Sequence, residues 1–248
     1  MGLTQALATS LSGLKVSQTG LSVVAGNVAN AQTPGYVAQS VGQESTTSGD
    51  VAGQGVRVTS INRVLDTFLQ QQLRTESAGG AYADKKASFY QQLQQVYGQP
   101  GSDTSFDAAF NNFTTAAQAL STSPSSFTAQ DQTLSAAQNL AQQLNGATQS
   151  IQALRSEADQ GMASDVQQAN NALQQIADIN QQLAGGAPND STAALLKNQR
   201  DQYIDQLAKL MDVRVVTGDR GQVSVFTSTG TQLVGAQAGH LDFTPTGT

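Results

Sequence analysis

The chain contains no cysteine and no tryptophan, and it has few aromatic and few charged residues. Across 248 residues, aromatic side chains make up 5% of the sequence and charged side chains 12%. The absence of cysteine excludes disulfides, thiolate catalysis and zinc–thiolate sites. The shortage of aromatic residues argues against the core of a globular enzyme. The 35 glutamines favour helix and suggest long, thin helical packing.

Positive charge is too sparse in this chain to predict nucleic-acid binding. Twelve Lys and Arg stand against 18 Asp and Glu, which gives a net charge of −6, whereas nucleic-acid binding requires clustered basic residues. No apolar run approaches the roughly 18 residues of a membrane span. The N-terminus also lacks the basic and apolar regions of a cleavable signal peptide. The sequence therefore predicts neither nucleic-acid binding nor membrane insertion.

An apolar heptad repeat occupies the first 28 residues. One apolar position recurs every seven residues, at Leu7, Leu14, Leu21 and Val28. A second seam position lies three residues before each of these, and Leu11 is its large apolar member. That second position holds Thr4, Leu11, Gln18 and Ala25. This spacing places an apolar seam along one side of a helix, where it needs a partner helix. An amphipathic helix folded back on the chain's own core has the same spacing, and periodicity leaves both interpretations open.

A turn signature follows the heptads directly. Asn27 and Asn30 tolerate unusual backbone angles, and the Thr-Pro-Gly run at 33–35 stops a helix. A residue before proline is biased towards extended geometry, and a β-like stretch begins after the run. The predicted turn residues are Asn27, Asn30, Thr33, Pro34, Gly35 and Tyr36.

The remaining pattern predicts a mainly α fold, an elongated helical bundle or coiled-coil rod with two small β regions. We expect a terminal-helix segment at 1–35, an extended β-like connector at 36–62, a long-helix bundle at 63–211 and a β-hairpin region at 212–248. The 3.6-residue period predicts helices over 64–96, 106–120, 134–183 and 190–210. Alternating residues predict short strands at 53–61, 213–225, 233–234 and 241–243.

No residues in the sequence form a catalytic, cofactor-binding or metal-binding pattern. His240 is the only histidine, and Asp242 nearby is not joined by a third ligand at a suitable spacing. Asp201 and Asp205 lie one helical turn apart among basic residues, which predicts a solvated, salt-bridged face. The basic residues are Lys197, Arg200 and Lys209. We therefore predict no enzyme activity, no cofactor and no metal.

The ordered string of heptad helix, Asn-x-x-Asn and Thr-Pro-Gly-Tyr resembles the N-terminal signature of the flagellar rod, hook and hook-associated protein superfamily. Segments at 68–74, 106–110 and 197–215 are similar to the family of flagellar hook-associated protein 1. The resemblance implies a structural subunit that joins hook to filament in the extracellular flagellum. It implies export in unfolded form through the flagellar type III channel.

The same resemblance implies a set of partners. These are further copies of the chain in a ring, the hook protein, the second junction protein and an export chaperone. In that family the N-terminal helix pairs with a C-terminal helix of the same chain in an inner tube. The present sequence stops at Thr248 without such a helix, so it is either a fragment or an unusually short member, and we expect a fragment alone to be monomeric.

Two alternatives remain open at the level of sequence. A hook or distal-rod protein of the same superfamily should lack the helical pattern at 128–184. A soluble coiled-coil adaptor could carry that pattern with an accidental N-terminal match.

Overall fold

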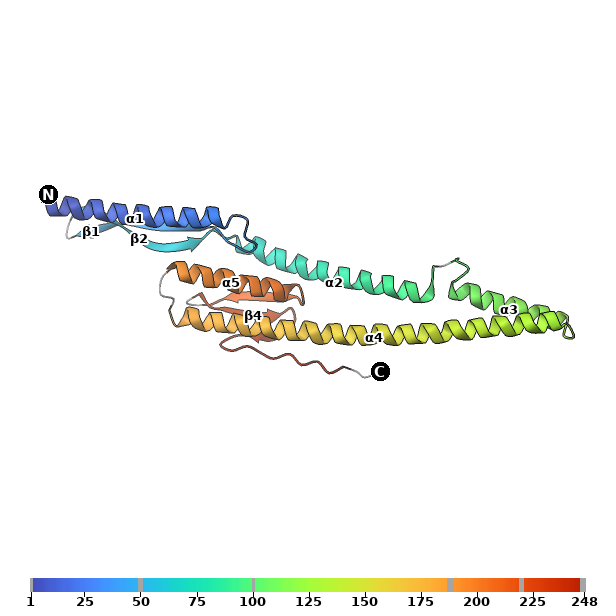
Figure 1. Ribbon diagram of the computed structural model, residues 1–248. Coiled ribbons are helices and arrows are strands. Elements are labelled where there is room, and N and C mark those ends of the chain that lie inside the picture. The colour runs from blue at the N-terminus through green and yellow to red at the C-terminus, as the bar shows by residue number, and fades with distance from the viewer. Residues whose placement is uncertain (1, 49–50, 100, 187–189, 219–220, 246–248) are drawn as a thin grey trace. The chain divides into compact units, whose positions relative to one another are not determined.

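The computed structural model describes residues 2–48, 51–99, 101–186, 190–218 and 221–245. Within these residues the chain forms five helices and five strands (Figure 1). In chain order they are α1 (Leu3–Ala29), β1 (Gln39–Ser48), β2 (Val51–Arg63), α2 (Thr67–Tyr97), α3 (Phe106–Thr122), α4 (Phe127–Ala184), α5 (Asp190–Ala208), β3 (Val213–Thr217), β4 (Val223–Thr227) and β5 (Gln232–Val234). The predicted mainly α fold with two small β regions is confirmed.

The chain divides into two compact units. The first unit comprises Met1–Gly79 and Gln167–Leu241, and the second comprises Gly80–Val166 and Asp242–Thr248. Two of the three boundaries fall inside long helices, one in α2 and one in α4, and the third follows Leu241. Residues of the predicted bundle at 63–211 contribute to both units, and the four predicted segments stay a prediction.

An antiparallel ribbon of β1 and β2 follows α1 in the first unit, and α1 lies along it (Figure 1). The register runs from Gln39 opposite Arg63 to Ser48 opposite Val51, with shifts after Gly42 and Thr46. The alternation at 53–61 correctly indicated the second strand. Its partner β1 lies inside the β-like connector expected at 36–62, but no separate strand was predicted there, because β1 is rich in Ser, Thr, Gln and Gly and shows no apolar alternation.

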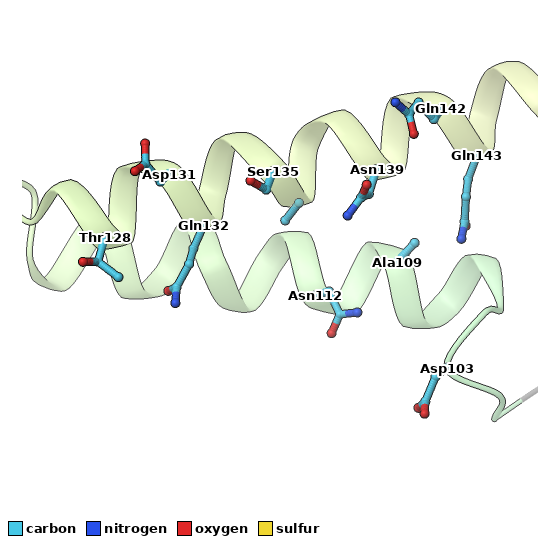
Figure 2. Close-up of a pocket in the computed structure, with 11 residues that line it drawn as sticks. Asp103, Ala109, Asn112, Thr128, Asp131, Gln132, Ser135, Asn139, Gln142 and Gln143 are labelled. Atoms are coloured by element: carbon cyan, nitrogen blue, oxygen red, sulfur yellow. The ribbon is translucent and has the colours of Figure 1, made fainter.

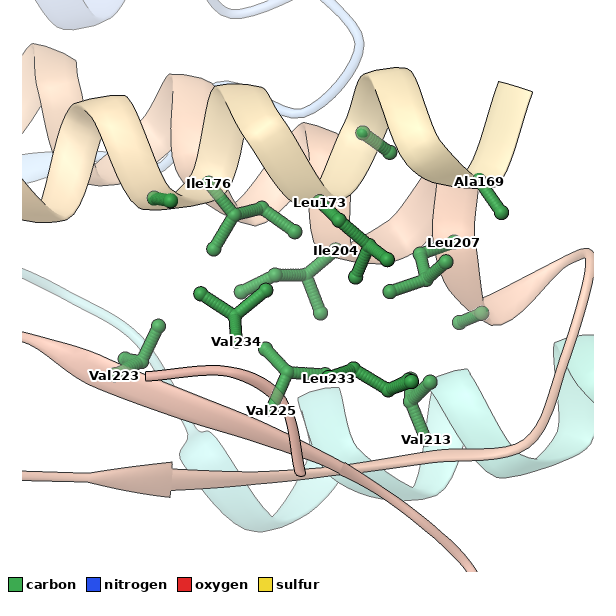
Figure 3. Close-up of a cluster of buried hydrophobic side chains, with 13 residues drawn as sticks. Ala169, Leu173, Ile176, Ile204, Leu207, Val213, Val223, Val225, Leu233 and Val234 are labelled. Atoms are coloured by element: carbon green, nitrogen blue, oxygen red, sulfur yellow. The ribbon is translucent and has the colours of Figure 1, made fainter. Parts of the chain in front are cut away.

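The core of the first unit lies between the last part of α4, α5 and a three-stranded antiparallel sheet (Figure 3). Leu173 and Ile176 from α4 meet Ile204 and Leu207 from α5, all fully buried. Val213, Val223, Val225, Leu233 and Val234 cover them from the sheet. Each such side chain contributes about 1.5–3 kcal/mol through its burial. This cluster is the main apolar core among the described residues.

The strands β3 and β4 confirm the predicted hairpin, although its turn residues 219–220 lie outside the described residues. The strand predicted at 241–243 is wrong. The Leu241 N–H donates to Asn170 Oδ1 at 2.9 Å, and the Leu241 carbonyl accepts from Asn170 Nδ2 at 2.8 Å. A side chain of α4 therefore satisfies the backbone groups that a neighbouring strand would have paired.

The second unit has little buried apolar surface. Its helices are the later part of α2, α3 and the first part of α4, and Ser105 caps α3 by accepting from the Ala108 N–H at 3.2 Å. Among its described residues only Ser105, Ala109 and Ala129 are buried. Most of the chain's aromatic residues belong to this unit, and several are exposed, among them Tyr82, Tyr90, Phe110 and Phe127.

The glycine pair Gly79–Gly80 lies inside α2, which continues through it without a break. A Cβ at either position would meet no atom within 4 Å. We expect Gly79→Ala and Gly80→Ala each to raise the free energy of unfolding by about 0.5–1 kcal/mol, because alanine loses less backbone entropy in a helix. Urea titration followed by circular dichroism measures this change.

Gly98, which directly follows α2, provides the control. Its φ is +77°, and an added Cβ would lie 3.1 Å from the Ser105 Cα. Gly98→Ala should therefore destabilise the chain by about 1 kcal/mol or more. An equal loss of stability from Gly79→Ala and Gly98→Ala would contradict this account.

Candidate functional site

The apolar seam of α1 is exposed along its whole length. Exposure of the five seam residues ranges from 50% for Leu11 to 71% for Val28. They are Leu7, Leu11, Leu14, Leu21 and Val28. Leu3 and Val24 on the same helix are exposed as well. The seam is therefore not part of the chain's own core among the described residues, and it forms an apolar stripe that a further helix could cover.

The opposite side of α1 faces the β1–β2 ribbon and is mostly small or polar. Val16 on that side is buried. Ser12 Oγ accepts from the Val56 N–H at 3.1 Å and donates to the Thr9 carbonyl at 2.7 Å. A Cβ on Gly55 would lie 3.2 Å from Ser12 Oγ, so the strand passes close to the helix there. The ribbon therefore packs against the side of α1 opposite the seam, and the seam stays exposed to solvent.

Asn27 connects the end of α1 to the start of β1. Its Oδ1 accepts from the Tyr36 hydroxyl at 2.9 Å and from the Gln39 N–H at 2.9 Å, and its Nδ2 donates to the Gln39 carbonyl at 2.8 Å. Asn30 closes the helix end, with Nδ2 donating to the Gly26 carbonyl at 3.0 Å. The amide side chain of Asn27 thus replaces a strand partner for one residue of β1.

The Thr-Pro-Gly run fastens the turn to α5. Thr33 Oγ1 donates to Asn30 Oδ1 at 3.3 Å, and the Pro34 carbonyl accepts from Gln202 Nε2 at 3.1 Å. Gly35 has φ +77°, and a Cβ there would lie 2.8 Å from Gln202 Cγ. Glycine is needed for both the backbone angle and the close approach of α5. The six turn residues lie together, and Gln202 is a partner that the sequence did not indicate.

Replacing Asn27 should loosen α1 from the ribbon. Asn27→Ala leaves the Tyr36 hydroxyl and both backbone groups of Gln39 without this partner, so we expect a loss of about 1–3 kcal/mol and faster hydrogen exchange in α1. Asn30→Ala is the control, since it removes only local bonds to Gly26 and Thr33 at the helix end and should cost about 1 kcal/mol or less. Equal effects of the two substitutions would show that Asn27 has no special role.

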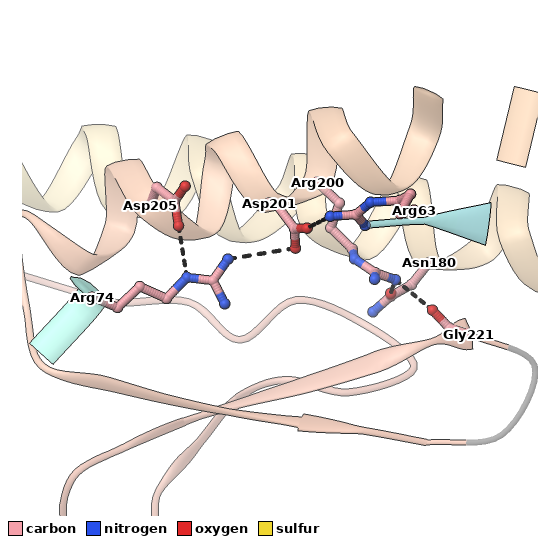
Figure 4. Close-up of polar contacts among 7 residues, drawn as sticks. All are labelled: Arg63, Arg74, Asn180, Arg200, Asp201, Asp205 and Gly221. Carbon is pink, nitrogen blue, oxygen red and sulfur yellow. Dashed lines mark hydrogen bonds and ion pairs between the residues drawn. The ribbon is translucent and has the colours of Figure 1, made fainter. Parts of the chain in front are cut away.

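Five charged side chains gather where β2, α2 and α5 meet in the first unit (Figure 4). Asp201 pairs with Arg63 through Oδ2 and with Arg74 Nη2 through Oδ1, the latter at 3.4 Å. Asp205 Oδ1 pairs with Arg74 Nε at 2.6 Å. Arg200 completes the cluster, and its side chain extends toward Asn180 and Gly221.

Arg200 is buried and bonded only to uncharged oxygens. Its Nη1 donates to the Gly221 carbonyl at 2.6 Å and to Asn180 Oδ1 at 3.2 Å. Burial lowers the pKa of Arg200 to about 10, Asp201 opposes this shift, and Arg63 and Arg74 add to it. The guanidinium still carries its charge at neutral pH.

The predicted solvated face around Asp201 and Asp205 is wrong for Asp201. The two carboxylates do face the same way, since both contact Arg74, but the Asp201 side chain is only 11% exposed. Its partners come from β2 and α2 and not from the basic residues of its own helix. Helical spacing could not reveal partners more than 100 residues away in the sequence.

A polar groove of about 810 Å³ lies between α3 and α4 in the second unit (Figure 2). It is lined by amides and hydroxyls such as Asn112, Ser135 and Asn139, with Asp103 and Asp131 as its only ionisable side chains. It lacks a nucleophile paired with a base.

His240 is exposed near the end of the described chain, as a plain surface residue would be. Among the described residues no three His, Cys, Asp or Glu side chains are grouped as metal ligands would be. None of the described helices combines the length and apolar character needed to span a bilayer.

The exposed seam and the exit turn coincide with one family match. Residues 7–36 match the family described as "Flagella basal body rod protein". This match relates the segment that holds the seam and the turn to a class of flagellar proteins. Residues 90–247 match the "Flagellar hook-associated protein FlgK helical domain". That match covers more than half of the chain, and the chain belongs to this family.

Curated relatives and a solved structure agree with this membership. The chain is 29% identical to "Flagellar hook-associated protein 1" of Bacillus subtilis over 237 residues, which cover 91% of this chain and 46% of the relative. It is 28% identical to the protein of the same name from Salmonella typhimurium over 251 residues, covering 95% of this chain and 43% of the relative.

The flagellar hook junction protein FlgK from Burkholderia pseudomallei has a similar structure. The TM-score is 0.60 at 30% identity, over 67% of this chain and 29% of that chain. The present chain spans less than half the length of the curated relatives it matches.

Proposed function

We propose that this chain is the N-terminal part of a structural subunit of the bacterial flagellum that joins the hook to the filament. The exposed apolar seam of α1 carries the proposal. Five large apolar side chains stand half or more exposed on a helix whose other side is fastened to the chain. Such a stripe is stabilised when another helix covers it. The similar proteins are named as flagellar hook-associated and hook junction proteins, which supports a role at the hook.

Assembly would proceed by helix packing at the seam, with Leu7, Leu11, Leu14, Leu21 and Val28 as the packing residues. The natural partner would be a C-terminal helix of the full-length chain, with neighbouring copies in a ring around it. The turn residues around Asn27 would fix the direction in which α1 leaves the first unit, because they tie it to β1 and α5. The role is structural, and no catalytic step is part of it.

Further partners follow from the same role. The subunit would contact the hook protein on one side and the second junction protein on the other. It would leave the cell unfolded by the flagellar type III route, aided by an export chaperone, and end in the extracellular flagellum. The second unit buries little apolar surface. This favours export in unfolded form, because little stabilising free energy is lost when such a unit is kept unfolded.

The proposal is tested by complementation. A motile bacterium that lacks its own hook-associated protein 1 receives this chain joined to the C-terminal portion of that protein. We expect filaments to be restored, as seen by electron microscopy and swimming in soft agar. Failure of a chimera that is stably expressed and exported would overturn the proposal.

A further inference from the structure

A second groove, of about 470 Å³, lies in the first unit between the start of α2, α5 and the β3–β4 hairpin. Its charged lining residues are Arg63, Arg74, Lys197, Arg200 and Asp201. Its apolar lining includes Leu65, Phe68, Val213 and Val215. With Asp205 included, this cluster has a net charge of +2, so the rest of the chain, whose total is −6, carries −8. Positive charge is thus concentrated at one place on an acidic protein.

The cations at this groove have too few anionic partners. The two oxygens of Asp201 are engaged by Arg63 and Arg74, and the hydrogen bonds of Arg200 within the described residues go to neutral oxygens. The Nε atoms of Arg63 and Arg200 are buried and have no hydrogen-bond partner among the described residues. A buried cation without a counter-ion is costly. A further oxyanion in the groove would lower that cost.

Asn198 adds a second buried group without a partner. It is 5% exposed, and neither its Oδ1 nor its Nδ2 has a hydrogen-bond partner among the described residues. On α5 it lies one turn after Ala194 and one turn before Asp201. Ala194 lines an adjoining groove of about 420 Å³ that shares Arg63 and Lys197 with the first. Asn198 thus lies between residues of α5 that line the two grooves, although it lines neither groove itself.

We propose that this groove is a carboxylate-binding site that receives an acidic side chain from a second copy of this chain. Guanidinium groups pair with carboxylates through charge-assisted hydrogen bonds. The groove is much larger than a small free ion, and its apolar side, where Phe68 is 75% exposed, suits a carboxylate carried on a protein segment. The excess of acidic residues elsewhere on the chain makes a second copy a complementary partner. The inference rests on the proposed function in one respect: it assumes that copies of the chain lie next to one another in the assembly.

The test uses the full 248-residue chain as an equal mixture of ¹⁴N- and ¹⁵N-labelled copies at millimolar concentration. A water-soluble carbodiimide joins a lysine amine to a carboxylate and takes up the water that is lost. Mass spectrometry then counts the cross-links that contain both isotopes. We expect mixed cross-links at Lys197 to exceed those at Lys209 by about fivefold to tenfold. Lys209 is exposed in the turn directly after α5 and lies outside the groove.

A pair of variants tests the apolar side of the groove. Phe68→Ser should reduce mixed cross-links at Lys197 to the level of Lys209. Phe127→Ser replaces an equally exposed phenylalanine outside the groove and should leave them unchanged.

Equal cross-linking of Lys197 and Lys209 in the unsubstituted chain would overturn the proposal. Saturable binding of inorganic phosphate, seen as shifts of the arginine side-chain signals in NMR, with no Lys197 excess would assign the site to a free ion and would also overturn it. The readout uses purified protein, so it is independent of the complementation result.

Discussion

Asp201→Ala is expected to lower the free energy of unfolding by about 3–5 kcal/mol. The Asp201 carboxylate lies between Arg63 and Arg74 with only 11% of its side chain exposed. Removing it leaves two guanidinium groups together in a poorly hydrated place, where their repulsion and lost solvation both oppose folding. The effect should appear as a lower urea midpoint by circular dichroism with little change in slope.

Asp205→Ala is the matched control for that experiment. Asp205 is on the same helix and contacts Arg74, but its side chain is 40% exposed. Arg74 itself is buried, but it keeps Asp201 as a partner when Asp205 is removed, so we expect Asp205→Ala to cost about 1 kcal/mol or less. If the two alanine substitutions cost the same, Asp201 does not hold β2 and α2 to α5 in the way described.

Leu173→Ala is expected to cost about 2–5 kcal/mol. Leu173 is fully buried in α4 and packs with Ile204, Val225 and other members of the apolar core (Figure 3). Truncation removes apolar burial and leaves a cavity that the helix and sheet around it can close only in part. Thermal and urea unfolding both report the loss.

Leu195→Ala provides the comparison, since Leu195 is 57% exposed on α5. A leucine outside the core should change stability by about 0.5 kcal/mol or less. A large loss from Leu195→Ala together with a small one from Leu173→Ala would place the core elsewhere.

The helices were the most predictable part of this fold, because their information is local. The three- and four-residue steps from Leu134 to Leu183 indicated α4, and the run from Phe106 to Leu120 indicated α3. The glycines at 79–80 weakened the pattern without ending the helix, since packing and neighbouring residues outweigh about 1 kcal/mol per glycine.

Elements that depend on distant partners could not be predicted in the same way. Strand β1 has no apolar alternation and exists because β2 pairs with it. The stretch at 241–243 alternates as a strand would, yet Asn170, 71 residues earlier, takes its hydrogen bonds. The environment of Asp201 is set by Arg63, 138 residues away.

The candidate site also has a part that the sequence predicted and a part that only the structure revealed. The seam and the turn were readable because every residue involved lies within 36 positions and follows a fixed spacing. That Asn27 bridges to Gln39, and that Gln202 fixes Pro34 across 168 residues, required the structure. The groove beside Arg200 gave no sequence signal, because its cations come from three separate segments.

The most direct test of the central claim is the seam itself, measured in the complementing chimera. Leu14→Asp with Leu21→Asp puts two charges on the exposed seam without touching the side fastened to the ribbon. The control places aspartate at Ser17 and Ser22, which are exposed on α1 beside the seam. Filaments are counted by electron microscopy while export into the medium is followed in parallel.

The account predicts normal export of both chimeras, normal filaments with the control and none with the seam variant. Filaments at the normal number and length with Leu14→Asp and Leu21→Asp would contradict the claim that this chain assembles through the apolar seam of α1.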